Sequence, residues 1–212
     1  LTQLMAKAMN RSLSNVLFSG FGAGGGEAIE ATGGTMKEVG PTDAAVMMAF
    51  ADKVLIVPGY GMAVAQAQHK VWEYAQLLEQ RGVEVKFAIH PVAGRMPGHM
   101  NVLLAEADVP YEQLIEMDVI NPDFKTTDAV IIVGANDVVN PAAIQSEGTP
   151  ISGMPILMAH EAQKVIICNF DKKPGYSGVM NPLYDSDRAI MMPGDAKASA
   201  RILISFLRPA GG

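Results

Sequence analysis

Two glycines, Gly59 and Gly61, stand where an apolar run gives way to a helical pattern. The run Val54–Val57 is short, mostly β-branched and bounded by turn residues, as expected for a strand buried on both faces. A glycine turn between such a strand and a helix can hold a diphosphate, because glycines let backbone N–H groups approach the ligand and the helix N-terminus carries partial positive charge. The spacing Gly59-x-Gly61-x-x-Val64 is a shortened dinucleotide fingerprint, with valine in place of the third glycine. An ordinary strand-to-helix turn explains this stretch equally well.

Charged residues after two later strands bear on which nucleotide would bind. In the usual arrangement, an acidic residue at the end of the second strand binds the ribose 2′-hydroxyl of NAD. Here that strand ends in Ile89-His90, and Arg95 follows in the next loop. Arg95 permits a 2′-phosphate instead, and Lys172 and Lys173 after the fifth strand are further phosphate partners. The alternative is that all three cations are solvated surface charges.

Other reactive side chains are few. Cys168 is the sole cysteine and ends the strand pattern Lys164–Cys168, so we expect an inert core thiol, no disulfide and no metal cluster. His90 and His99 could relay or sense protons, or could simply bond to loop backbone. The sequence contains no Ser/His/Asp nucleophile elbow, no HExxH zinc motif and no CxxC pair.

Apolar runs and helical patterns alternate along the chain. The expected strands are Val54–Val57, Val83–Ile89, Ile115–Met117, Ala129–Val133, Lys164–Cys168 and Ala189–Met192. The expected helices are Ala44–Ala51, Ala63–Arg81, Met100–Ala107 and a last helix from about Ala196 to Leu207. This alternation predicts an α/β fold with a doubly wound, parallel, six-stranded Rossmann-like sheet of strand order 3-2-1-4-5-6. The loops after strands one, two, four and five then meet at the carboxyl edge, where such sheets bind ligands, and this favours the dinucleotide interpretation.

Two helices carry finer expectations. Thr42 or Asp43 is the expected N-cap of the first. Gly82 is the expected C-cap of the helix Ala63–Arg81. The buried stripe of that helix is expected to be Val64, Ala67, Val71, Ala75 and Leu78.

The 212 residues, 49% of them apolar, suffice for one α/β domain and an appendage. A net charge of −6 without any basic run argues against a nucleic-acid surface. Gly20–Gly26 is typical of a flexible linker, so residues 1–40 are expected to form a tether and residues 41–212 the compact domain. Leu1–Phe21 has apolar residues at helical spacing and fits a surface helix, a packing helix or the tail of a membrane helix. Because the first residue is leucine, we expect a fragment or a processed chain.

Long motifs in the chain resemble one enzyme family. These motifs are Pro58–Gln68, His90–Ala107, Gly134–Asp137, Asn181–Leu183 and Gly194–Lys197. From Val54 to about Leu207 the chain resembles the NADP(H)-binding domain of proton-translocating nicotinamide nucleotide transhydrogenase, the enzyme's third domain, carried on its beta subunit. Residues 9–18 resemble the end of that family's last membrane helix and the hinge that follows it.

The resemblance implies reversible hydride transfer between NAD(H) on a partner subunit and NADP(H) bound here, coupled to proton movement through a membrane domain. It implies that the partners are an NAD(H)-binding subunit and a transmembrane domain in a dimeric holoenzyme. The location would be the cytoplasmic face of a bacterial inner membrane, or the mitochondrial matrix face in a eukaryote. Direct ring-to-ring transfer needs proximity and exclusion of water and no nucleophile. The rivals are a regulatory nucleotide-binding module and, with few residues left for a substrate pocket, a soluble NADP-dependent dehydrogenase.

The resemblance also implies which residues line the coenzyme, which the family binds in reversed orientation on the sheet. The lining residues would be Gly59, Tyr60, Gly61, Met62, Ala63, Val64, Ala93, Gly94, Arg95, Met96, Pro97, Gly98, Asn136, Asp137, Val138, Gly194, Asp195 and Ala196. Residues 169–176 would fold over the coenzyme as a lid. The lid's contacts would come from Asn169, Asp171, Lys172, Lys173, Gly175 and Tyr176.

One departure from the family concerns the start of this lid. The family often has a Lys-Arg-Ser triplet there that grips the 2′-phosphate. This chain has Asn169-Phe170-Asp171, and the cations follow as Lys172-Lys173. We therefore expect a reorganised phosphate grip with NADP preference retained.

Asp137 is the first candidate for coupling nucleotide binding to proton movement. It follows the fourth strand beside the expected nicotinamide end, and it could titrate or pair with Arg95. Coupling would act through the affinity for NADP(H) or through the docking geometry of the domain. The alternative is that Asp137 caps a local Asx turn.

Overall fold

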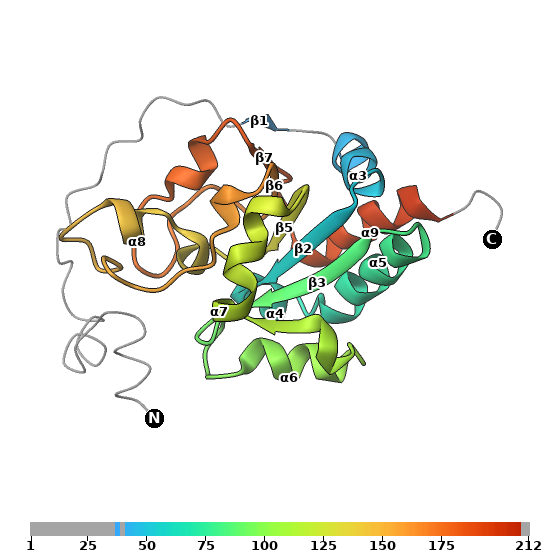
Figure 1. Cartoon of the computed structure of the whole chain (residues 1–212), viewed down its shortest axis with the longest axis horizontal. Helices are drawn as coiled ribbons and strands as arrows, with labels where there is room; N and C mark the ends of the chain where they lie inside the picture. Colours follow the sequence, from blue (N-terminus) through green and yellow to red (C-terminus); the bar gives the residue numbers. More distant parts are fainter. Residues whose placement is uncertain (1–36, 39–40, 209–212) are drawn as a thin grey trace.

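A parallel sheet of seven strands organises the molecule, and helices cover both of its faces (Figure 1). The computed structural model describes residues 37–38 and 41–208. The strand order is β1-β7-β6-β5-β2-β3-β4, and every neighbouring pair is parallel. The strands are β1 (Lys37–Glu38), β2 (Lys53–Pro58), β3 (Glu84–Ile89), β4 (Leu114–Glu116), β5 (Ala129–Val133), β6 (Lys164–Cys168) and β7 (Ala189–Met191).

The predicted fold class and strand order are confirmed. Strands β2 to β7 are the six expected strands, and their order across the sheet is the expected 3-2-1-4-5-6. The bounds of β5 and β6 agree with the prediction to the residue, and the other strands differ by one residue at one or both ends. The additional strand β1 pairs with β7 and comes from the range that the sequence assigned to the tether.

The sheet separates two apolar cores, which explains why its strands read as continuous apolar runs. Ile56 and Ile131 face one core together with α3 (Pro41–Ala49), α5 (Gln68–Gln80) and α9 (Ala196–Leu207). Leu55 and Ile132 face the other core. That second face is covered by α7 (Met117–Ile120) and the 3-10 helices η2 (Asn121–Thr126), η4 (Ala159–Glu161) and η5 (Pro182–Asp185). The remaining elements are α4 (Tyr60–Val64), α6 (His99–Glu106), η1 (Tyr111–Gln113), η3 (Asp137–Val139) and α8 (Ala142–Gln145).

The long helix expected over Ala63–Arg81 is wrong as a single element. It is two helices, α4 and α5, separated at Gln66, whose φ is 50°. The amide of Ala67 donates to the carbonyl of Met62 across the break (3.0 Å) and lets both residues remain buried. Val64 therefore turns outward and is 65% exposed, whereas the rest of the expected stripe is buried. No glycine or proline marks the break in the sequence.

The ends of two helices test the expected caps. Helix α3 begins at Pro41, so neither Thr42 nor Asp43 is its N-cap. Proline is favoured at the first helical position, where its missing N–H and fixed φ cost nothing. Arg81 is the C-cap of α5, so the expectation for Gly82 is wrong by one position. Gly82 follows it with a φ of 84°, in the left-handed region that glycine adopts most easily after a helix.

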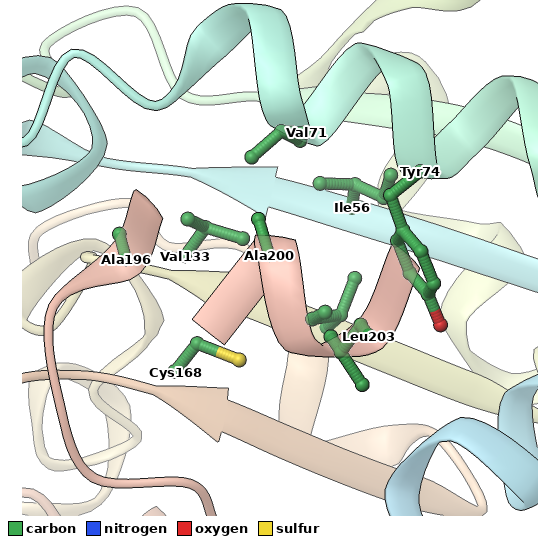
Figure 2. A pocket seen from close by; sticks show the side chains of 9 residues that line it. Ile56, Val71, Tyr74, Val133, Cys168, Ala196, Ala200 and Leu203 are labelled. Atoms are coloured by element: carbon green, nitrogen blue, oxygen red, sulfur yellow. The ribbon is translucent and has the colours of Figure 1, made fainter. Parts of the chain in front are cut away.

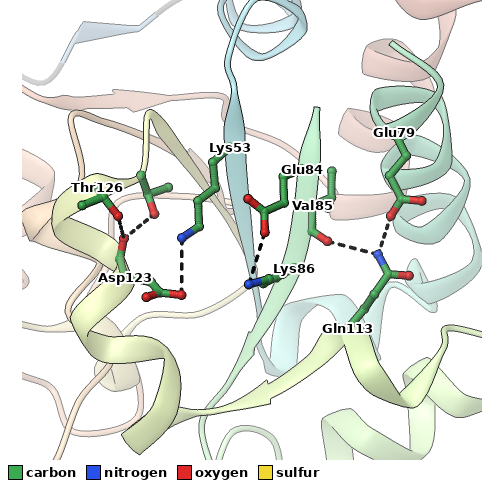
Figure 3. Close-up of polar contacts among 9 residues, drawn as sticks. Lys53, Glu79, Glu84, Val85, Lys86, Gln113, Asp123 and Thr126 are labelled. Carbon is green, nitrogen blue, oxygen red and sulfur yellow. Dashed lines mark hydrogen bonds and ion pairs between the residues drawn. The ribbon is translucent and has the colours of Figure 1, made fainter. Parts of the chain in front are cut away.

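Ion pairs and side-chain hydrogen bonds stabilise the amino edge of the sheet (Figure 3). The Lys53 ammonium lies 3.3 Å from the Asp123 carboxylate, and the Thr126 hydroxyl donates to the Asp123 carbonyl over 3.1 Å. The Asp128 carboxylate accepts from the backbone amides of Asp52 (2.9 Å) and Lys53 (3.1 Å). Figure 3 also draws Glu84 with Lys86, and Gln113 with Val85 and Glu79.

The expectations for the first 36 residues, including Leu1–Phe21 and the linker Gly20–Gly26, lie outside the described residues. Within 37–38 and 41–208, no helix combines the length and the apolar character needed to cross a bilayer.

Candidate functional site at the carboxyl edge of the sheet

The glycine turn after β2 packs directly on the end of β5. The amide of Gly59 donates to the carbonyl of Val133, and the amide of Gly61 donates to the carbonyl of Gly134, each over 2.9 Å. A Cβ atom on Gly61 would lie 2.7 Å from the Gly134 Cα, and one on Gly134 would lie 2.4 Å from the Gly61 Cα. Gly134 also has a φ of 69°. These glycines thus let two loops touch, and the amides of Gly59 and Gly61 already have partners within the chain.

The loop after β5 connects to the predicted lid through Asn136 and Asp137. The Asn136 side-chain amide donates to the carbonyl of Lys173 over 3.0 Å. The Asp137 carboxylate accepts from the Ser177 amide (2.9 Å) and from the Ser177 hydroxyl (2.6 Å). The Asn181 amide group donates to both the carbonyl and the side-chain oxygen of Asn136, each over 3.2 Å. Residues 173–181 therefore lie across the loop after β5.

Asn169 fixes the start of the predicted lid and has a spare acceptor. Its side-chain NH₂ donates to the carbonyl of Ala135 (3.0 Å) and to the Tyr184 hydroxyl (2.5 Å). Its backbone carbonyl accepts from the amide of Gly194 over 3.0 Å. Its side-chain oxygen is buried and has no hydrogen-bond partner among the described residues. Burial raises the pKa of Tyr184 to about 12, so this hydroxyl stays protonated at neutral pH.

Both histidines of the loop after β3 bond to backbone, as the simpler alternative predicted. His90 is buried, with its Nδ1 accepting from the Val92 amide (3.2 Å) and its Nε2 placed 2.8 Å from the Pro155 carbonyl. This pattern requires the neutral ring with its proton on Nε2. Burial lowers the pKa of His90 and favours that neutral form. His99 Nδ1 accepts from the amide of Arg95 over 3.1 Å.

Arg95 lies against an aromatic ring. Its guanidinium carbon is 4.6 Å from the centroid of the Tyr60 ring, a cation–π contact that joins the loops after β2 and β3. Asp137, its suggested ion-pair partner, accepts hydrogen bonds from Ser177 instead.

The loop after β7 completes the edge. Asp195 is the N-cap of α9, and its carboxylate accepts from the amide of Ala198 over 3.0 Å. Gly194 joins this loop to Asn169. The structure therefore brings together the predicted site residues after β2, β5, β6 and β7, and Arg95 links the β3 loop to them through Tyr60.

The predicted lining residues differ in what their side chains can reach. Met62, Ala93 and Ala196 are buried and belong to the apolar core, so their side chains are not exposed at this edge. On the lid, Phe170 is 80% exposed and Tyr176 is 71% exposed. The ammonium group of Lys173 lies 3.7 Å from the Asp171 carboxylate, and its side chain is largely exposed.

A small apolar cavity lies in the core between the sheet and helices α5 and α9 (Figure 2). Its lining residues are Ile56, Val71, Tyr74, Ile131, Val133, Cys168, Ala196, Ala200 and Leu203. Cys168 is a buried free thiol, and burial raises its pKa to about 12. The expectation of an inert core thiol is consistent with this position. In residues 37–38 and 41–208, no group of three or more His, Cys, Asp or Glu side chains could hold a metal ion.

Three residues outside the predicted set hold the site together. Ser177, Asn181 and Tyr184 each bond to a predicted site residue and were assigned no role. The available signal was position alone, because Ser177 and Asn181 lie within or beside motifs already noted. Gly134 was noted within a motif, but its packing against Gly61 depends on two loops that are distant in sequence.

Comparisons with known proteins identify the family. A family model described as NAD(P) transhydrogenase beta subunit matches residues 1–205. NAD(P) transhydrogenase subunit beta of Rhodospirillum rubrum is 52% identical over 212 residues, covering 98% of this chain and 45% of the relative. The subunit from strain ATCC 11170 of that species matches with the same values. The chain thus spans under half the length of these curated relatives.

Two solved structures share a distant likeness with the chain. A mutant Sir2 homologue in complex with 2′-O-acetyl ADP ribose is 12% identical with a TM-score of 0.47, and the match covers 78% of this chain and 96% of that one. An exopolyphosphatase-related protein from Bacteroides fragilis is 12% identical with a TM-score of 0.42, covering 78% and 43%. Scores this low carry no argument about function. The motifs, the sheet order and the match over residues 1–205 together show that this chain belongs to the NAD(P) transhydrogenase beta subunit family.

Proposed function

We propose that this chain is the NADP(H)-binding component of a proton-translocating transhydrogenase. In this role it exchanges hydride reversibly between its own NADP(H) and NAD(H) on a partner subunit. The observation that carries the proposal is the meeting of the family's motifs at one edge of the sheet, where Asn136 and Asp137 contact the predicted lid. The proposed domain division is residues 1–40 as hinge and linker and residues 41–212 as the nucleotide-binding domain.

The residues at the edge fit a nicotinamide dinucleotide. The side-chain oxygen of Asn169, which has no partner among residues 37–38 and 41–208, suits a ligand donor such as a ribose hydroxyl or the carboxamide of nicotinamide. Lys172 and Lys173 on the lid, with Arg95 across the edge, supply cations for a 2′-phosphate. Asp171 accepts from the amide of Lys173 over 2.9 Å, so the lid backbone presents this lysine in a defined turn.

The glycine turn supports the reversed coenzyme orientation. In the usual orientation, amides of this turn hold the diphosphate. Here the amides of Gly59 and Gly61 donate to carbonyls at the end of β5. In the proposed orientation, the diphosphate binds nearer the other loops of the carboxyl edge, and the glycine turn after β2 contacts a different part of the coenzyme.

The bound coenzyme supplies the hydride chemistry. The chain's own residues position it, exclude water with the lid and leave the reactive ring accessible to the partner. Asp137 lies beneath the lid, where a change in its hydrogen bonds alters how firmly the lid is held. That is our candidate step for linking proton movement to coenzyme affinity.

The whole enzyme adds the partners and the location. We propose an NAD(H)-binding subunit and a transmembrane domain as partners in a dimeric holoenzyme. The domain would lie on the cytoplasmic face of the bacterial inner membrane, or on the matrix face in mitochondria. The 45% coverage of the curated relatives leaves ample chain for the remaining domains.

Calorimetric titration of the chain with NADP and with NAD tests the proposal. We expect one-to-one binding with a strong preference for NADP. Replacing Lys172 or Lys173 with alanine should weaken NADP binding about tenfold and NAD binding little. Lys164→Ala is the matched control, because Lys164 lies at the amino end of β6, on the opposite edge of the sheet. Equal affinity for the two coenzymes would contradict the proposal.

Turnover assays separate the rivals. The proposal expects no hydride transfer between NADPH and an NAD analogue until an NAD(H)-binding subunit of this family is added. Turnover with a small alcohol or acid would favour a soluble dehydrogenase. Coenzyme binding without transfer in any pairing would favour a regulatory module.

A further inference from the structure

The segment from residue 169 to residue 181 is held firmly at both ends. At its start, Asn169 bonds to Ala135 and Tyr184. At its end, Val179 is buried in a small apolar cluster, and Asn181 bonds to Asn136. The ends therefore provide fixed points, and any opening of the segment must take place between them.

Between these fixed points, the middle of the segment rests on Asn136 and Asp137. Asn136 contacts the carbonyl of Lys173, and Asp137 receives two donors from Ser177. The Ser177 hydroxyl also accepts from the amide of Val179 over 3.2 Å. One hydroxyl thus connects the Asp137 carboxylate to the fixed end of the segment.

Gly175 allows the lid backbone to approach Asp137 closely. A Cβ atom at Gly175 would lie 3.0 Å from the carboxyl carbon and both oxygens of Asp137. The backbone of the lid therefore lies directly against the carboxylate, while the neighbouring Tyr176 is 71% exposed. The close packing gives the two hydrogen bonds from Ser177 a fixed geometry.

We infer that Ser177 is a positioning residue, a latch that holds the lid on the loop after β5 and fixes the Asp137 carboxylate. The inference rests on the proposed function and deepens it, because it makes lid opening the step that sets how fast NADP(H) leaves. From the sequence, Ser177 has no role of its own, and Asp137 was expected to titrate, to pair with Arg95 or to cap a local Asx turn. The structure assigns Asp137 a different partner, on the lid itself.

The expected effect follows from the kind of bond. Hydrogen bonds to charged acceptors are stronger than neutral ones, and Ser177→Ala removes one while leaving the backbone amide in place. We expect the lid to open about ten times more often in this variant, and NADPH to leave about ten times faster. Ser177→Thr keeps the hydroxyl and should stay close to the parent chain.

Hydrogen exchange in the ligand-free chain is the first measurement. Ser177→Ala should raise exchange at the amides of residues 175–179 and leave strands β5 and β6 unchanged. Ser205→Ala is the control, because the Ser205 hydroxyl bonds only within α9, to the carbonyl of Ile202. Unchanged exchange at residues 175–179 in Ser177→Ala would overturn the latch, as would equal acceleration in the threonine variant.

Stopped-flow release of NADPH is the second measurement. Faster release in Ser177→Ala, restored by threonine, supports the inference. Faster lid exchange with unchanged release would overturn the link between the latch and the coenzyme. A chain that shows the exchange effect but binds no NADP(H) would overturn the proposed function while the latch itself stands.

Discussion

The two edges of the sheet are built from different chemistry. At the amino edge, charged side chains pair or cap within the chain, as in Lys53 with Asp123 and Asp128 with two amides. At the carboxyl edge, glycines bring loops into backbone contact, and amide and hydroxyl groups join them. At the carboxyl edge, the side-chain oxygen of Asn169 has no partner within the described part of the chain, and Phe170 and Tyr176 are exposed. The difference is that charged pairs and caps stabilise the amino edge, whereas loop-to-loop packing forms the carboxyl edge, where we propose that the coenzyme binds.

The largest expected loss of stability comes from a substitution that disrupts the contact between two loops of the carboxyl edge. Gly134→Ala places a Cβ atom against Gly61 at a φ of 69°, so we expect the free energy of unfolding to fall by about 3 kcal/mol or more. Gly148→Ala is the matched control, since Gly148 has a φ of 75° with nothing within 4 Å of its Cβ position, and should cost about 1–2 kcal/mol. Urea unfolding measures both, and equal losses would show that loop contact is unimportant.

The second prediction compares two carboxylates, one from each edge. Asp128→Ala leaves the amides of Asp52 and Lys53 without their acceptor and should lower the free energy of unfolding by about 1–2 kcal/mol. NADP(H) binding should not change. Asp137→Ala should instead change NADP(H) release, because its partner Ser177 lies on the lid. The comparison fails if calorimetry finds that Asp128→Ala weakens coenzyme binding as much as Asp137→Ala.

The third prediction uses pH to loosen the carboxyl edge. Burial lowers the pKa of His90, so the unfolded state takes up a proton first as the pH falls below about 6.5. The contribution of neutral His90 to the free energy of unfolding is therefore fully present above that pH. Below it, this contribution falls by at most about 1.4 kcal/mol per pH unit.

His90→Gln should show a smaller loss than the parent chain when urea unfolding is measured at about pH 7.5 and about pH 5.5. Some pH dependence should remain, because desolvation also lowers the pKa of His160. Parallel curves for parent and variant would rule out His90 as a source of acid sensitivity.

The smallest effect is expected at the amino edge. Lys53→Met removes the ion pair with Asp123 and keeps the apolar stem of the side chain. The free energy of unfolding should therefore fall by about 0.5 kcal/mol. The difference should shrink in about 1 M salt, which screens the pair. If Lys53→Met lowered the free energy of unfolding as much as Gly134→Ala, the expected order of these effects would be wrong.

The sequence by itself determined the sheet and its order. Runs such as Ala129–Val133 and Lys164–Cys168 are apolar at every position or nearly so, because both faces of these strands are covered. Right-handed crossovers then leave few ways to order the strands, and the motifs of the loops identify the family.

Only the tertiary structure decided which groups meet at the carboxyl edge. Local periodicity could not reveal the break at Gln66, because the carbonyl of Met62 and the burial of Ala67 stabilise it there. Nor could it reveal that Asp137 bonds to Ser177, forty positions away, while Arg95 packs on Tyr60. Such contacts depend on the spacing of neighbouring strands, which brings distant loops together whatever their separation along the chain.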